Sequence, residues 1–204
     1  YVKEYEEETN LRAYILLDAS ASMGFAGNGE AKFAYARKIA GSLAYLASCQ
    51  GDAVGLFCPN GKRQLELPAK RNPAHLNTLY DLLEDTVPDG ETNILGALHD
   101  MAEKVRRRAL IVVLSDFFCP IDELASCLQH LRFQKHDLAI FRLLDPMETK
   151  FEFDRPMRFQ DLESPFNLVT EPAMIRDLYL EEINKHRDAL RTACLEFNVD
   201  FREV

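Results

Sequence analysis

Two kinds of hydrophobic pattern alternate along this chain. Short, continuous apolar runs lie at residues 13–17, 53–57 and 109–114. Runs of this kind are typical of strands that are buried on both faces in a parallel sheet. The segments between them carry apolar residues at the three- and four-residue spacing of an amphipathic helix, most clearly over residues 32–49. The pattern therefore predicts strands that alternate with helices.

The predicted elements follow the order of βαβ units. We expect strands at residues 13–17, 53–57, 63–67, 109–114, 138–144 and 199–204, and helices at 32–49, 73–83, 94–105, 121–133 and 173–197. Because Asn60-Gly61 is a hairpin signal, the strand at 63–67 is expected to be an antiparallel edge strand. Strands and helices of these lengths favour an α/β fold with a doubly wound, mostly parallel central sheet and helices on both faces.

The stretch from 147 to 169 is less regular than the rest. Residues 151–153 and 157–162 are the candidates there for short strands, and Asp145-Pro146 is interpreted as a turn. No internal repeat and no low-complexity segment interrupts the chain. With 204 residues, it is long enough to bury one core, so residues 1–204 are expected to form a single domain.

Composition narrows the classes of partner. Hydrophobic residues make up 47% of the chain and charged residues 28%, with a formal net charge of −9. This acidic balance disfavours nucleic acid and anionic membranes as main partners. The longest apolar stretch, Ala109–Leu114, is far shorter than the roughly 20 residues needed to span a bilayer. No export signal is visible, so we expect a cytoplasmic protein without membrane insertion. The chain opens at Tyr1 rather than Met, and we interpret it as a fragment that lacks an N-terminal portion.

The candidate functional residues lie where predicted strands end or helices begin. Asp18, Ser20 and Ser22 follow the first strand, Asp116 follows the most apolar strand, and Thr92 precedes a helix. In open α/β sheets, ligands bind beyond the carboxyl ends of the strands, so these segments should converge. All five side chains carry hard oxygen donors, which suit Mg²⁺, or Mn²⁺ or Ca²⁺, better than zinc. Alternation within an extended loop would direct Asp18, Ser20 and Ser22 to one side.

Neutral hydroxyl ligands would leave much of the charge of such an ion uncompensated. The ion would then attract an acidic oxygen from outside, such as a carboxylate on another protein. The sequence thus predicts a divalent cation that bridges two proteins and does no catalysis.

Asp18-Ala19-Ser20-Ala21-Ser22, followed by Thr92 and Asp116, resembles the metal-ion-dependent adhesion site of von Willebrand A domains. The resemblance implies that the two serines and the threonine bind the ion directly, whereas the aspartates act through water or as hydrogen-bonding supports. Further blocks are similar to bacterial proteins of domain-of-unknown-function family 58, namely residues 15–23, 32–37, 106–108, 115–116 and 143–146. This family implies a MoxR-type AAA+ ATPase as the partner and no established reaction.

Several alternatives stay open. The fold could act as an interaction scaffold without metal, or, less favoured, as a metal-dependent hydrolase. A haloacid-dehalogenase-like phosphatase needs a carboxylate two residues after its nucleophile, where this chain has Ser20. The glycine-rich nucleotide motifs and the GxSxG motif are absent, so we do not expect an enzyme. Asp145, which also ends a predicted strand, is a secondary candidate for a metal ligand. Glu91 and Asn93 are secondary candidates for the rim of the site, and Arg106–Arg108 for a partner contact.

Overall fold

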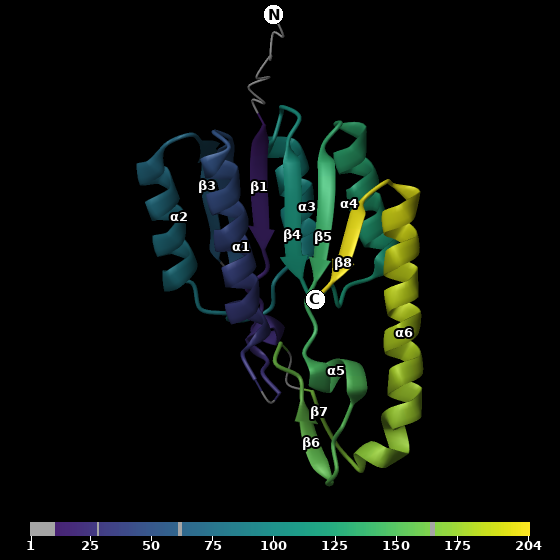
Figure 1. Ribbon diagram of the computed structural model, residues 1–204. Coiled ribbons are helices and arrows are strands. Elements are labelled where there is room, and N and C mark those ends of the chain that lie inside the picture. The colour runs from purple at the N-terminus through teal and green to yellow at the C-terminus, as the bar shows by residue number, and fades with distance from the viewer. Residues whose placement is uncertain (1–10, 28, 61–62, 164–165) are drawn as a thin grey trace, which may run out of the picture.

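The computed structural model describes residues 11–27, 29–60, 63–163 and 166–204. Six strands form one sheet in the order β3-β2-β1-β4-β5-β8, and a separate two-stranded sheet joins β6 to β7 (Figure 1). The strands are β1 (Arg12–Leu17), β2 (Ala53–Asn60), β3 (Arg63–Lys70), β4 (Leu110–Ser115), β5 (Asp137–Arg142), β6 (Met157–Gln160), β7 (Asn167–Thr170) and β8 (Asp200–Glu203). The helices are α1 (Lys32–Cys49), α2 (Pro73–Asp85), α3 (Ile94–Lys104), α4 (Ile121–Phe133), α5 (Pro146–Lys150) and α6 (Pro172–Glu196), with a short 3₁₀ helix, η1, at Ala21–Gly24.

The main sheet is parallel except at one edge. Strand β1 pairs in parallel with both β2 and β4, β4 pairs with β5, and β5 pairs with β8. Strand β3 pairs antiparallel with β2 and forms the edge. The predicted fold class is therefore confirmed, including the antiparallel edge strand. The hairpin dipeptide used for that prediction includes Gly61, which lies outside the described residues.

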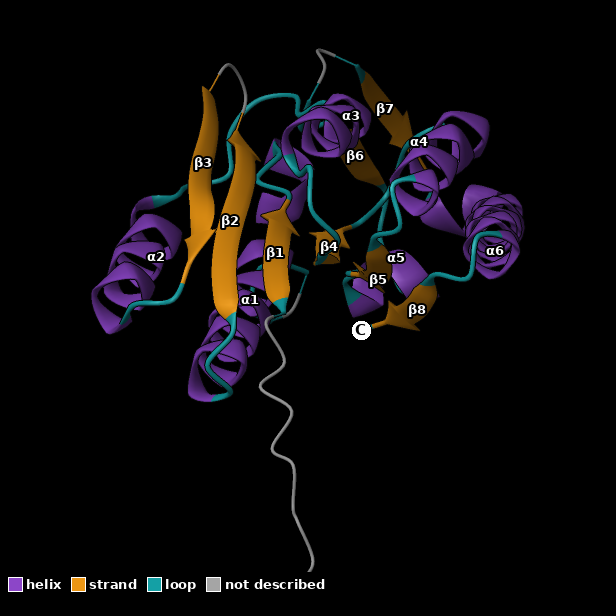
Figure 2. Ribbon diagram, turned by 90° about the horizontal axis from the view of Figure 1, so that it is seen from above, coloured by secondary structure: helices purple, strands orange, loops and turns teal. Residues whose placement is uncertain are grey.

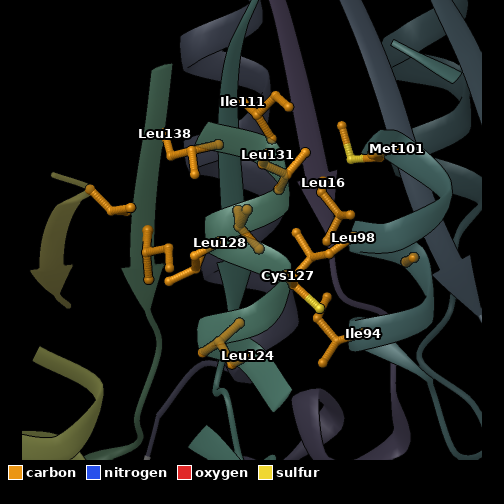
Figure 3. Close-up of a cluster of buried hydrophobic side chains, with 14 of the residues drawn as sticks. Leu16, Ile94, Leu98, Met101, Ile111, Leu124, Cys127, Leu128, Leu131 and Leu138 are labelled. Atoms are coloured by element: carbon orange, nitrogen blue, oxygen red, sulfur yellow. The ribbon is translucent and has the colours of Figure 1, made fainter. Parts of the chain in front are cut away.

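Helices cover both faces of the sheet, as Figure 2 shows from above. Alternate residues of each central strand point to opposite faces. On β1, Leu16 packs against α3 and α4, whereas Ile15 and Leu17 pack against α1 and α2. Figure 3 shows the first of these clusters, in which Leu98 and Leu128 meet the sheet. Two separate cores thus fix the central strands from both sides, which explains their continuous apolar sequence.

The stretch after β5 differs from the prediction. Residues 151–153 are not a strand, and residues 146–150 form α5 instead. Asp145 caps this helix in a capping box with Glu148, and Pro146 occupies its first turn. Asp-Pro was interpreted as a turn, although the same pair is also a helix-start signal. Phe151 has a left-handed backbone (φ 51°), which ends the helix and is incompatible with a strand.

The rest of this stretch forms a small unit beside the sheet. Residues 157–160 form β6, close to the expected strand at 157–162, and the strand β7 was not predicted. Rings of Phe151, Phe153, Phe159 and Tyr179 stack or meet edge-on, with centroids 4.3–5.5 Å apart. Figure 1 shows that α5 and the β6–β7 hairpin lie beyond the carboxyl ends of the sheet strands. The aromatic cluster therefore anchors the hairpin on that side of the sheet.

Membrane insertion was not expected from the sequence. Among the described residues, no helix is both long and apolar enough to cross a bilayer.

The close approach of three strands at Gly55 predicts a strong effect of one methyl group. A Cβ at Gly55 would lie 2.6 Å from the Tyr14 ring and 2.8 Å from the Leu67 carbonyl oxygen. We expect Gly55→Ala to lower the free energy of unfolding by about 1–3 kcal/mol, measured by urea denaturation. Gly29→Ala is the control, because among the described residues no atom beyond its own chain neighbours lies within 4 Å of its added Cβ. Equal stability of the two variants would contradict this packing.

Candidate metal centre

The candidate site lies where β1 and β4 end next to each other. The two strands pair in parallel through Leu17 and Leu114, and the Asp18 amide donates to the Leu114 carbonyl at 2.9 Å. Because β1 lies between β2 and β4, the strand order reverses at this point in the sheet. This is the topological switch point at which open α/β sheets form ligand sites.

Asp18 and Ser20 are held by a tight turn at the end of β1. One Asp18 carboxylate oxygen accepts the Ser20 amide at 3.0 Å, and the other accepts the Ser115 hydroxyl at 2.6 Å. Both Asp18 and Ser20 are buried. Ser115 is the last residue of β4, so this hydrogen bond fixes the Asp18 carboxylate against the neighbouring strand.

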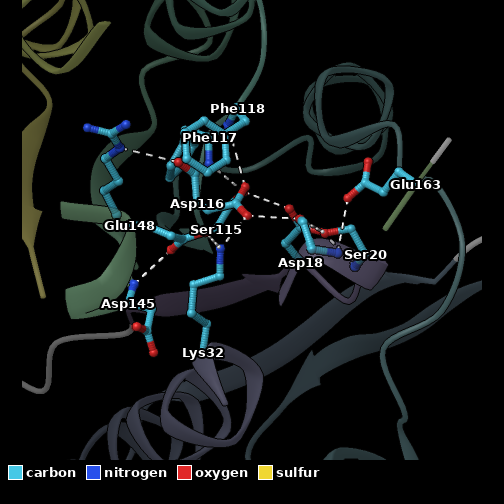
Figure 4. A network of polar contacts seen from close by, with 12 residues as sticks. Asp18, Ser20, Lys32, Ser115, Asp116, Phe117, Phe118, Asp145, Glu148 and Glu163 are labelled. Atoms are coloured by element: carbon cyan, nitrogen blue, oxygen red, sulfur yellow. Dashed lines mark hydrogen bonds and ion pairs between the residues drawn. The ribbon is translucent and has the colours of Figure 1, made fainter. Parts of the chain in front are cut away.

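The segment that follows is a 3₁₀ helix and not the extended loop expected from alternation. Its geometry still brings the hydroxyls together, with Ser20 Oγ and Ser22 Oγ 3.0 Å apart. Ser22 Oγ donates to Asp116 Oδ2 at 2.8 Å. Figure 4 shows Asp18, Ser20 and Asp116 converging. The expected convergence of the first and fourth strands therefore occurs, by a different local conformation.

Thr92 comes from a third segment, which is hydrogen-bonded to the first. The Ala21 amide donates to the Gly90 carbonyl at 2.9 Å, and the Asp89 amide to the Ala19 carbonyl at 3.1 Å. Asn93 caps α3, with its side chain accepting the Gly96 amide at 2.7 Å. The Thr92 hydroxyl is buried and has no hydrogen-bond partner among the described residues. Asn93, and not Thr92, is thus the side chain that caps α3.

Lys32 is a member of the site that the sequence analysis did not identify. Its side chain is 3% exposed, and its ammonium contacts Asp116 Oδ2 at 2.9 Å and Glu148 Oε1 at 2.8 Å (Figure 4). A lysine at the first position of a helix opposes the helix dipole, and the first turn of α1 has no acidic residue. This unfavourable placement is the signal in the sequence that could have identified Lys32, because a lysine there has to pair with carboxylates from elsewhere in the fold.

Two glutamates and Asp145 complete the surroundings. Glu163, which the sequence analysis did not identify either, accepts the Ser22 amide at 3.2 Å. Glu148 accepts the Asp145 amide at 2.8 Å in the capping box. Asp145 accepts the amides of Met147 and Gly27, so both of its oxygens bind backbone groups. Glu91 is exposed, as are Arg106, Arg107 and Arg108.

The backbone of Asp116 is also bound by a buried arginine. Arg142 is fully buried, and its Nε donates to the Asp116 carbonyl at 3.3 Å. The guanidinium also contacts Glu203 at 3.3 Å and lies 5.7 Å from the centroid of the half-exposed Phe118 ring. Phe117, between them, has a left-handed backbone (φ 55°) and a buried ring. These contacts fix the turn after β4 and leave Phe118 at the rim of the site.

Burial and a like charge control the protonation of Asp18. Burial, with a smaller contribution from the nearby Asp116 carboxylate, raises the pKa of Asp18 to about 6, although the Ser115 hydrogen bond opposes the shift. Burial also raises the pKa of Glu148, and the Lys32 ammonium opposes that shift. A nearby positive charge would therefore stabilise the ionised form of these buried carboxylates.

The donor set fits a hard divalent cation. Among the described residues, no three His, Cys, Asp or Glu side chains are grouped so as to hold a metal ion. The donors here are instead three hydroxyls and two carboxylates, and one hydroxyl, that of Thr92, is buried without a partner. A buried hydroxyl without a partner is costly, and a metal ion is one ligand that would satisfy it.

Comparison with known proteins places the chain in a family. Residues 1–189 match the family described as "Protein of unknown function DUF58", and the chain belongs to this family. Uncharacterised proteins of Mycobacterium tuberculosis and Mycobacterium bovis are 26% identical over 201 residues. The match covers 94% of this chain and 62% of each relative, so the chain spans less than two thirds of their length.

Solved structures agree on the fold. An aerotolerance-related membrane protein of Bacteroides fragilis has a TM-score of 0.63 at 18% identity, covering 95% of this chain and 91% of its own. The protein BatB of Bacteroides thetaiotaomicron has a TM-score of 0.57 at 14% identity, with 95% and 90% covered. The VWA domain of SpRpn10 has a TM-score of 0.51 at 12% identity, with 66% and 76% covered. The von Willebrand A-like fold and the family are thereby confirmed, whereas the metal site, the ATPase partner and the cytoplasmic location stay predictions.

The raised pKa of Asp18 predicts a pH-dependent stability. The folded protein holds the Asp18 proton more tightly than the unfolded chain, so this group stabilises the fold below about pH 4. The contribution is lost as the pH rises through about 6 and amounts to about 3 kcal/mol. Asp18→Asn cannot ionise. In chelator, the parent should therefore lose stability relative to this variant as the pH rises from 4 to 8. The difference between their free energies of unfolding should change by up to about 3 kcal/mol in favour of the variant. Parallel pH profiles would contradict the assignment.

Proposed function

We propose that this protein is a metal-dependent protein-interaction module. Asp18, Ser20, Ser22, Thr92 and Asp116 hold a divalent cation, Mg²⁺ or else Mn²⁺ or Ca²⁺, and the cation binds an acidic group of a partner protein. The observation that carries the proposal is the buried Thr92 hydroxyl without a partner, on a segment hydrogen-bonded to the one that carries Ser20. Its hydrogen-bonding capacity is met if an ion lies there.

The arrangement of charge supports binding rather than catalysis. Ser20 and Ser22 present neutral oxygens 3.0 Å apart, and Asp116 is already bonded to Ser22 and Lys32. A divalent ion on such ligands keeps much of its positive charge and attracts an external carboxylate. At the rim, Phe118 is 52% exposed, and aromatic side chains are enriched in protein interfaces. These features suit a surface that recognises an acidic residue in an apolar setting.

The partner that family membership favours is a MoxR-type AAA+ ATPase. The resemblance described above implies this association, and the curated relatives, which are longer than this chain, are uncharacterised. In this proposal the protein contributes the ion and the rim, and the ATPase contributes the carboxylate. We propose no reaction at the site.

A metal-independent interaction scaffold is the second candidate. The observation in its favour is Lys32, whose ammonium already neutralises Asp116 at 2.9 Å. In that case the same surface would bind its partner equally well in chelator.

Replacing Thr92 by its isostere valine should separate metal binding from stability. Thr92→Val removes the hydroxyl and keeps the shape, so the affinity for Mn²⁺ should fall at least about tenfold. In chelator the variant should be as stable as the parent or more stable, by about 1 kcal/mol, because a buried polar group without a partner is removed. Calorimetric titration and urea denaturation measure the two effects. Unchanged Mn²⁺ affinity would remove Thr92 from the site.

The direct test of the function is calorimetric titration of Mg²⁺ and Mn²⁺ into chelator-treated protein, followed by capture of the MoxR-type ATPase of the same genome. Ser20→Ala and Asp116→Ala should lose saturable binding of the ion and capture of the ATPase together. Ser126→Ala is the matched control, because its exposed hydroxyl donates to the Asp122 carbonyl within α4, away from the candidate site. ATPase capture that persists in chelator and in both site variants would favour the scaffold instead.

A further inference from the structure

Lys32 is a buried charged group whose ion pairs lie within the candidate site. Its side chain is 3% exposed, and two carboxylates from distant segments meet its ammonium, Asp116 at 2.9 Å and Glu148 at 2.8 Å. Burying an ammonium is costly unless it is well paired. The same Asp116 oxygen accepts the Ser22 hydroxyl at 2.8 Å, so the ammonium binds inside the candidate metal site and not beside it.

This inference rests on the function proposed above. We propose that the Lys32 ammonium is a built-in competitor of the divalent cation for Asp116, and that Glu148, which the ammonium already contacts, retains it when the ion binds. Lys32 thereby lowers the affinity of the site for metal ions. It also favours divalent over monovalent ions, because a monovalent ion offers the carboxylates no more charge than the ammonium it displaces.

Electrostatics makes the two cations mutually exclusive at Asp116. A divalent ion held by Ser20 and Ser22 would be a close neighbour of an ammonium bonded to the same carboxylate oxygen, and like charges at that range in a buried site repel strongly. The lysine can yield, because its four-carbon side chain is flexible and its ammonium has no fixed bonding plane. The divalent ion, with the higher charge, replaces it on Asp116.

Glu148 is suited to retain the displaced ammonium. Its Oε1 contacts Lys32, and its Oε2 accepts the Asp145 amide at 2.8 Å in the capping box of α5. The glutamate is therefore held by its own helix and stays in place when the lysine leaves Asp116. Lys32 thus keeps one of its two carboxylates in both states.

A charge-matched double variant tests the competition. Lys32→Met/Glu148→Gln removes one positive and one negative charge, so the net charge of the site does not change. If Lys32 competes, calorimetry should show Mn²⁺ binding at least about tenfold tighter than in the parent. The rise in melting temperature on adding Mn²⁺ should also be larger. Lys38→Met/Glu30→Gln is the matched control, because Lys38 lies on the same helix as Lys32 and pairs with Glu30, but the two side chains are 67% and 41% exposed.

A second measurement needs no variant of the site. In protein labelled with ¹⁵N-lysine, a buried and hydrogen-bonded ammonium exchanges its protons slowly enough to give its own signal. Titration with Mg²⁺, which is diamagnetic, should shift the Lys32 signal with the same midpoint as the calorimetric binding curve.

The outcomes separate this inference from the proposed function. Tighter Mn²⁺ binding in the double variant than in the parent supports the inference. Mn²⁺ binding by the double variant alone, with no binding by the parent, supports it as well. Unchanged or weaker binding in a folded double variant overturns it and leaves the metal function standing, as does a Lys32 signal that does not move while Mg²⁺ binds. Absence of Mn²⁺ binding in both the parent and the double variant overturns both proposals.

Discussion

The parallel pairing of β1 with β4 is the constraint on which the site depends. It brings Asp18 and Ser115 side by side at the carboxyl ends of the strands, where they share a hydrogen bond of 2.6 Å. Two apolar cores, one on each face of the sheet, hold this pairing in place. Because the strands are buried on both faces, their packing in the core fixes the positions of the polar residues that follow them.

Asp116 is where the separate parts of the molecule meet. Its carboxylate binds Ser22 of η1 and Lys32 of α1, and its carbonyl accepts from Arg142 of β5. Through Lys32 and Glu148 the network continues to α5, and from there the aromatic cluster around Phe151 reaches the β6–β7 hairpin. A cation bound at the strand ends would thus act on a network that extends beyond the sheet. This gives the irregular stretch after β5 a structural link to the site.

Local sequence signals predicted most elements but erred where two interpretations compete. Apolar runs and helical spacing predicted the long helices and the strands of the main sheet other than β3, because burial on one or both faces imposes those periods. The edge strand β3 was predicted from the hairpin signal that precedes it. Asp145-Pro146 fits both a turn and a capped helix, and only the Glu148 side chain closing the capping box decides between them. Residues 151–153 are apolar enough for a strand, but the left-handed backbone of Phe151 and its ring contacts exclude it.

For the candidate site, the sequence by itself determined which oxygen donors follow which strands. Their approach at one edge also followed, since parallel strands end on the same side of a sheet. Only the tertiary structure decided that Lys32 and Glu148 join them. Lys32 is 84 positions from Asp116 and 116 positions from Glu148, and ion pairs over such separations leave no periodic signal in the sequence. It also decided that Asn93 caps α3 and leaves the buried Thr92 hydroxyl without a partner. Periodicity records which face of an element is buried, whereas charges that meet across the fold are set by how those faces pack.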